Sequence, residues 1–202
     1  MKVLTNWLVA LGTLIAVVVA IWGDFLRSKL APPKLRFVLY NTRGTVTRIT
    51  QGPRVIYYHL KIVNSRPWFL AKNCQVRLIG ISQRGPDNNF RSVSNPVPPT
   101  FVWSPAGFVP VATNISKEQI FDFGRVAEGE QEFEPVLHFY PNNFQGRIGA
   151  NQAIRYTLEV VGDNVSKVAP LVLEVAWNGQ WIDNLDIMAL NLTIGEIHPT
   201  MP

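Results

Sequence analysis

Few side chains in this 202-residue sequence combine into a pattern that could catalyse a reaction or hold a metal ion. The three histidines, His59, His138 and His198, are far apart and show none of the spacings of metal ligands. The single cysteine, Cys74, has no accompanying histidine pattern, and the strand expected around it turns the thiol into the core. No phosphate-loop, dinucleotide or nucleophile-elbow motif is present in the sequence. We therefore predict no enzyme activity, no catalytic residue, no metal site and no cofactor.

Two acidic stretches could hold a cation, although a structural role is the favoured interpretation of both. In the first, four glutamates alternate, so a strand would place them on one face: Glu128, Glu130, Glu132 and Glu134. Such a ridge could bind a cation or a basic partner, or it could be a solvated edge that discourages strand addition. The second stretch, 183–186, is a weak cation-loop pattern, and we expect a turn at the end of a hairpin.

Aromatic residues supply the candidate sites for contact with a partner. The segment 95–110 combines five prolines with three aromatic side chains, and long irregular segments of compact domains are often functional. The favoured interpretation of this segment, as an alternative to partner binding, is a crossover between sheets with the aromatic side chains turned inward. Later, Asn178-Gly179 predicts a two-residue hairpin that places Trp177 in the core and Trp181 on the opposite face. The candidates for binding an unidentified protein or small ligand are Trp181, Phe101, Trp103 and Phe108.

The chain is organised around its first apolar run, Val3 to Gly23, which contains no charged residue. As a helix, about 21 residues span roughly 30 Å, enough to cross the hydrocarbon core of a bilayer. Trp7 and Trp22 lie near the two ends, where indoles favour the headgroup level. A cleaved signal peptide is the alternative, but the run is long for one and the helical pattern continues to the prolines at 32 and 33. We expect a retained transmembrane anchor.

Charges beside the anchor predict its orientation and its contact with lipid. Only Lys2 precedes the apolar run, whereas four cations, offset by Asp24, follow it: Arg27, Lys29, Lys34 and Arg36. Because Lys and Arg near a span stay cytoplasmic, we expect the large domain in the cytoplasm, at a cell inner membrane, with these four side chains at lipid headgroups. A periplasmic or extracellular domain is the alternative. Small residues at helical spacing would allow homo-oligomers through one helix face: Gly12, Ala16 and Ala20.

Basic and acidic residues are unevenly divided along the chain. Residues 1–91 contain 14 Lys and Arg and 2 acidic residues, while residues 92–202 contain 5 and 12. A basic surface facing lipid or nucleic acid is one interpretation. The favoured one is that strands from both halves interleave and offset their charges, so nucleic acid is not an expected partner.

Alternation of apolar and polar residues predicts an all-β domain. The clearest strands cover 55–63, 154–160 and 171–177, and eight or nine short strands with no second helix are expected. This pattern favours an antiparallel β-sandwich of immunoglobulin or fibronectin type. The expected divisions are an anchor with a basic extension at 1–31, the sandwich at 32–198 and a loose tail at 199–202.

Four segments together resemble bacterial single-span membrane proteins that carry one soluble β-sandwich and to which no activity is assigned: IWGDFLRSKL, PPKLRF, YYHLKIVN and AWNGQW. The resemblance covers most of the chain and implies an architecture and a bacterial inner-membrane setting, without site residues. The first hypothesis is a membrane-anchored binding module. The second is a secreted or periplasmic adhesion-like or chaperone-like domain, and the third is an enzyme.

Overall fold

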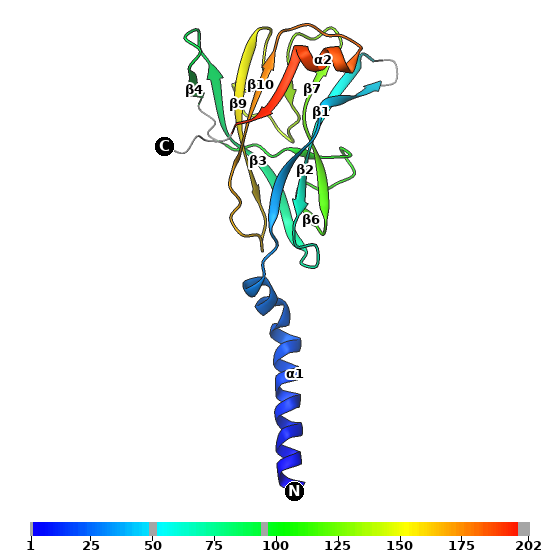
Figure 1. The fold of residues 1–202 in the computed structure, drawn as a ribbon, viewed down its shortest axis with the longest axis vertical. Coiled ribbons are helices and arrows are strands. Elements are labelled where there is room, and N and C mark those ends of the chain that lie inside the picture. Colours follow the sequence, from blue (N-terminus) through cyan, green and yellow to red (C-terminus); the bar gives the residue numbers. More distant parts are fainter. Residues whose placement is uncertain (1, 49–51, 94–96, 198–202) are drawn as a thin grey trace.

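Two antiparallel sheets pack face to face, and a long helix projects from one end of them (Figure 1). This computed structural model describes residues 2–48, 52–93 and 97–197, and within the first helix it describes side chains at 7–23. The predicted two-sheet, mostly-β fold is confirmed at this level. The expected tail at 199–202 and His198 lie outside the described residues.

The first sheet has the strand order β1-β2-β7-β5, and β8 also pairs with β7. Its strands are β1 (Leu35–Arg48), β2 (Arg54–Asn64), β5 (Val102–Trp103), β7 (Glu118–Ala127) and β8 (Glu134–Pro135). The predicted apolar face of β2 is buried, as its alternation requires: Ile56, Tyr58, Leu60 and Ile62. Residues 41–44 form an irregularity within β1, where the pairing with β2 shifts and Gly44 adopts a φ of 82°.

The second sheet has the strand order β11-β10-β9-β3-β4, and β6 also pairs with β3. Its strands are β3 (Ala71–Arg84), β4 (Phe90–Val93), β6 (Thr113–Ile115), β9 (Gln152–Val161), β10 (Leu171–Trp177) and β11 (Leu192–Glu196). The alternation predicted for β9 and β10 is confirmed, because every second side chain of each strand is buried. Cys74 is fully buried as expected, and burial raises the pKa of its thiol to about 11.

An aromatic cluster fills the space between the sheets. The Phe123 ring lies 5.7 Å from Tyr156, 5.8 Å from Phe133 and 5.9 Å from Phe101, measured between ring centroids. All four side chains are essentially inaccessible to water. Offset and edge-to-face ring pairs of this kind add about 0.5–1.5 kcal/mol each to the burial of their area. The two sheets are therefore locked together by side chains that belong to both.

The predicted two-residue hairpin at Asn178-Gly179 is wrong. Trp177 pairs with Leu192, so residues 178–191 connect β10 to β11. That connection contains a second helix, α2 (Leu185–Asn191), so the prediction of no second helix is also wrong. The Asn184 side chain caps α2 by accepting hydrogen bonds from the backbone of Asp186 and Ile187. The cap explains the 183–186 stretch as the start of a helix.

The predicted strand of alternating glutamates is also wrong. Gly129 adopts a φ of 84°, and the backbone N–H of Glu130 donates to the carbonyl of Ala127 at 3.0 Å, which makes a turn. Of the four glutamates, only Glu134 lies in a strand. The side chains therefore do not form the continuous acidic ridge that alternation suggested.

The first helix, α1 (Lys2–Leu30), extends away from the sandwich, with its amino terminus at the far tip (Figure 1). Among the residues with described side chains, which in α1 are 7–23, no helix is long and apolar enough to cross a membrane. The fold therefore establishes a projecting amino-terminal helix.

Candidate functional site

The proline-rich segment crosses from one sheet to the other and buries two of its three aromatic side chains. The backbone N–H of Phe101 donates to the Val76 carbonyl of β3 at 2.9 Å, and Val102 pairs with Asp122 of β7. The indole N–H of Trp103 donates to the Val111 carbonyl at 3.0 Å. Phe101 and Trp103 are fully buried, so they cannot contact a partner from this position. The crossover alternative describes both residues correctly.

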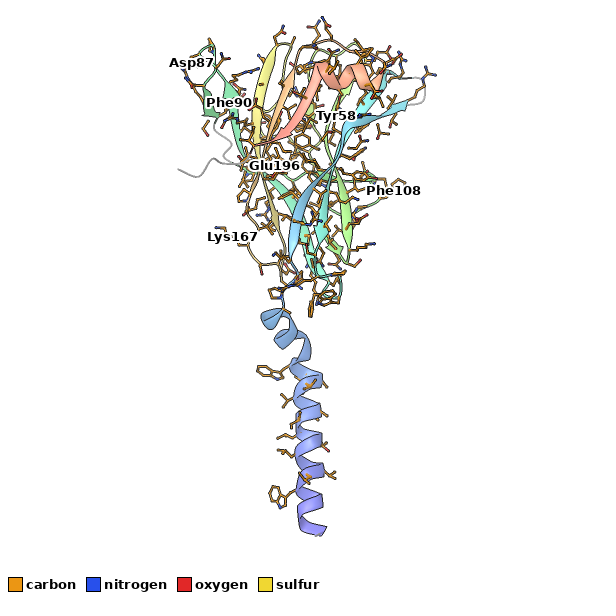
Figure 2. All side chains as sticks on the ribbon, viewed as in Figure 1. Tyr58, Asp87, Phe90, Phe108, Lys167 and Glu196 are labelled. Carbon is orange, nitrogen blue, oxygen red and sulfur yellow. The ribbon has the colours of Figure 1, made fainter. Side chains whose placement is uncertain are left out.

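Phe108 is the member of that aromatic set that reaches the surface, with 86% of its area exposed. It lies in the tight loop between β5 and β6, where its backbone N–H donates to the Pro105 carbonyl at 3.3 Å. Gly107, just before it, adopts a φ of 80° that favours glycine. Figure 2 shows the side chain projecting from the flank of the sandwich. Phe108 is therefore the structure's best-placed aromatic candidate for contact with a partner.

Trp181 lies partly buried against the core rather than on an open face. The reason is the long connection after β10, in which the Asn178 side chain accepts the Gln180 N–H at 2.9 Å and bends the chain toward α2. The indole nitrogen of Trp181 is buried without a hydrogen-bond partner in the described part of the chain. Its role as a surface contact, which depended on the two-residue hairpin, has no support from this placement.

A histidine and a carboxylate form a pair that sequence reasoning missed. Nδ1 of His59 on β2 lies 2.9 Å from Oδ1 of Asp122 on β7, and Asp122 is almost fully buried. The His59 ring stacks on Tyr57, with 6.4 Å between centroids and 11° between planes. Within the described ranges, no group of three or more His, Cys, Asp and Glu side chains is close enough to hold a metal ion. The pair orients the imidazole and satisfies a buried carboxylate.

The acidic stretch contributes to a pocket of about 430 Å³ lined by Glu130, Gln131, Glu132, Glu134 and Arg147. Burial works to raise the pKa of Glu134, but hydrogen bonds from Arg125 and Arg147 outweigh it and hold the pKa below its ordinary value. Both guanidinium groups lie 3.0 Å from its carboxylate. Glu134 is therefore already neutralised by this chain's own arginines.

The residues predicted to meet lipid or a second helix lie on α1 and just after it. Gly12, Ala16 and Ala20 are exposed on α1, and a methyl group built at Gly12 would meet no atom within 4 Å. Lys34 and Arg36 are exposed where the chain enters the sandwich. The side chains of Arg27 and Lys29 lie outside the described set.

The described apolar side chains of α1 have no cover from the sandwich. Every described side chain from Trp7 to Trp22 is exposed, with 72% of Trp7 and 55% of Trp22 accessible. A contiguous apolar surface of this kind marks a site of contact with a membrane or another protein. Comparisons with protein-family models, with curated proteins and with solved structures find no match to this chain.

Proposed function

We propose that this chain is a single-pass membrane protein that holds a β-sandwich binding module at the cytoplasmic face of a bacterial inner membrane. One observation carries the proposal: the side chains from Trp7 to Trp22 are exposed on a 29-residue helix that lies outside the sandwich. Residues 3–23 contain no charge, so lipid is the environment that would cover them at least cost. The four cations at 27–36 favour the cytoplasmic side for the domain.

The arrangement of strands supports an immunoglobulin-like module. The order β1-β2-β7-β5 opposite β4-β3-β9-β10 corresponds to the two sheets of that fold, with β11 added at one edge. Domains of this architecture serve many functions and are often binding modules, so the fold alone does not name the ligand. Phe108 is the surface contact that we assign to a protein or small-ligand partner, because a large exposed aromatic side chain gains most from being covered. The proposed role is binding rather than catalysis.

Extraction of membranes at alkaline pH tests the anchor. The full chain should stay with the membrane pellet, whereas Leu14→Lys combined with Val18→Lys should release it, because charges at mid-helix oppose insertion. Asn142→Lys, on an exposed loop of the sandwich, is the matched control and should stay in the pellet. Release of the unsubstituted chain would overturn the proposal.

Protease treatment tests the side of the membrane. A cytoplasmic domain is cleaved in inverted vesicles and protected in spheroplasts. The reverse result would replace the cytoplasmic assignment with the periplasmic alternative and leave the anchor intact.

A further inference from the structure

Hydrogen bonds join the loops at the end of the sandwich nearest α1, which we call the helix-proximal end: residues 31–36, 64–73, 112–118 and 162–170 (Figure 1). The chain leaves α1 through Pro32, whose carbonyl accepts a hydrogen bond from Arg66 Nη1 at 3.1 Å. The Lys34 carbonyl accepts the backbone N–H of Ser65 at 2.8 Å. These bonds fix the loop 65–70 beside the point where α1 joins the sandwich.

Two asparagine side chains brace that loop from within. Asn64 is buried and donates to the Phe69 carbonyl at 2.7 Å and to the Ser116 carbonyl at 3.2 Å. Asn164 donates to the Leu70 carbonyl at 2.8 Å and also accepts the N–H of Lys72 at 2.8 Å. The surface that the loop presents is therefore held in a defined position relative to α1.

Unpaired positive charge gathers at the helix-proximal end. Its two described acids are engaged, Glu118 by Lys61 at 3.3 Å and Asp163 by the Asn73 amide at 2.6 Å. In the described ranges, the cations of the helix-proximal end form no ion pair, whereas several arginines toward the opposite end of the sandwich form ion pairs with acidic side chains. The cations are Lys34, Arg36, Arg66, Lys72, Lys117 and Lys167.

Three of these cations line one pocket of about 540 Å³. Lys34, Arg66 and Lys167 surround it together with Pro32 and Ser166, and none of the described residues that line it is acidic. Lys167 is seen at the α1 side of the sandwich in Figure 2. Ammonium, guanidinium and hydroxyl groups in one hollow are suited to a phosphate group, which guanidinium binds through paired N–H donors.

Exposed apolar side chains stand on the same loop as Arg66. Trp68 is 73% exposed and Leu70 is 40% exposed, although both lie in a loop whose backbone is braced. The Phe69 ring lies against Trp68 with 6.4 Å between centroids. An indole with cations beside it matches the interface of a bilayer, where apolar carbon and charged headgroups meet.

We propose that the helix-proximal end rests on the bilayer and binds anionic phospholipid, with a headgroup phosphate held between Lys34, Arg66 and Lys167 and with Trp68 in the interface. The inference rests on the proposed function, because the bilayer that holds α1 would face this end directly. An acidic protein would have to enter between the sandwich and that bilayer to reach the same cations. The sandwich is then oriented on the membrane, with α2 and the loops opposite α1 facing away from it.

The test uses the full chain in nanodiscs of phosphatidylcholine, alone or mixed with phosphatidylglycerol. A nitroxide on Ser65→Cys reports on the helix-proximal end, and one on Asn142→Cys reports on an exposed loop near the other end. Buried Cys74 should take up little label, and the unsubstituted chain measures that background. In mixed discs we expect the label at 65 to be several-fold less accessible to a water-soluble nickel chelate than the label at 142.

Substitutions then identify the groups responsible. In the unsubstituted background, phosphatidylglycerol should lower the accessibility of the label at 65 to the nickel chelate. Arg66→Gln with Lys167→Gln should remove this effect of phosphatidylglycerol. Trp68→Ser should raise the accessibility of the label at 65 in both lipids. Arg48→Gln with Arg84→Gln, at exposed sites toward the other end, is the matched control. It should change neither the effect of phosphatidylglycerol nor the accessibility of the label at 65. If Arg66→Gln disturbs the fold through its lost bond to Pro32, Lys34→Gln with Lys167→Gln tests the same pocket at exposed side chains.

Two failures are distinguishable. The proposed lipid-binding surface would be wrong if the labels at 65 and 142 were equally accessible in a protein that had entered the discs. It would also be wrong if the protection of the label at 65 changed neither with phosphatidylglycerol nor with substitution of the cations. Either result would leave the proposed anchor intact. A chain that does not enter the discs at all would overturn the proposed anchor and this surface with it.

Discussion

Phe133 occupies the space that a side chain at position 124 would need. A Cβ built on Gly124 would lie 2.1 Å from Cζ of Phe133, far inside any contact distance. Phe133 is itself fully buried and packs against Tyr58 at 6.0 Å and Phe123 at 5.8 Å between centroids, so its ring cannot move aside without displacing these neighbours. Glycine at 124 is therefore a packing requirement of the aromatic cluster.

Gly124→Ala should lower the free energy of unfolding by about 1–3 kcal/mol, the usual cost of overpacking a well-filled core. Denaturation by urea, followed by near-ultraviolet circular dichroism of the full chain in mild detergent, measures this change. Gly195→Ala is the matched control on β11, where a Cβ would meet no described atom beyond its chain neighbours within 4 Å, and it should change stability by about 0.5 kcal/mol or less. Equal effects at the two positions would contradict the packing described for Phe133.

The proline-rich segment contains two buried aromatic residues and one exposed one, and stability measurements should separate buried Trp103 from exposed Phe108. Trp103→Ala removes a fully buried indole and its bond to Val111, so it should cost about 3–5 kcal/mol. Phe108→Ala removes a ring that is 86% exposed and should shift stability by about 0.5 kcal/mol or less. A large loss from Phe108→Ala would show that the ring is covered within the folded chain, which would remove it as a surface for a partner.

The sequence correctly predicted the strands in which the alternation of apolar residues matches the side chains that are buried in the core. In β2, β9 and β10 the alternating apolar side chains all face the core, so period-two spacing was a sufficient signal. Apolar residues also alternate from Met188 to Ile194, but this spacing does not indicate a strand at its start, because Met188 is buried in α2 while Leu190 is 77% exposed. There the Asn184 cap decides the local structure, and the long-range pairing of Trp177 with Leu192 overrides the Asn178-Gly179 hairpin signal.

The candidate sites were less predictable because they depend on contacts between distant segments. His59 and Asp122 are 63 residues apart and meet only through the pairing of β2 with β7. Likewise, Arg66 and Lys167 join Lys34 only because the ends of three strands converge near α1. Alternation shows which face a side chain occupies, but it does not show which strand lies beside it.

Stability should depend on pH through the contact of Glu128 with Arg54. Hydrogen bonds from the Arg54 guanidinium and backbone N–H lower the pKa of Glu128 to about 2, from an ordinary value of 4.5. A lowered carboxylate pKa stabilises the folded state above pH 4.5, and this contribution is lost as the pH falls toward 2. Glu128→Gln should therefore flatten part of the decline in the urea midpoint between these two values.

The control for this pH effect is Glu130→Gln, two residues away at an exposed position. It should leave the acid decline as steep as in the unsubstituted chain. Some decline should persist in Glu128→Gln, because neighbouring groups also lower the carboxyl pKa values of Asp87 and Glu134. Identical pH profiles for the unsubstituted chain and Glu128→Gln would show that the Arg54 contact is not held in solution.

Asn64 should be the polar residue on which the loop beside α1 most depends. Its buried amide serves the carbonyls of Phe69 and Ser116, and its Oδ1 accepts the N–H of Arg66 at 3.0 Å. Asn64→Ala leaves these backbone groups without their partner, so it should cost about 1–3 kcal/mol. Hydrogen exchange should also quicken at Arg66, whose amide loses its acceptor, while Asn142→Ala on an exposed loop should change neither quantity. Unchanged exchange at Arg66 would mean that the backbone at 65–70 keeps its position without Asn64. In that case Asn164 and the hydrogen bond from Arg66 to Pro32 would be the contacts that stabilise the helix-proximal end.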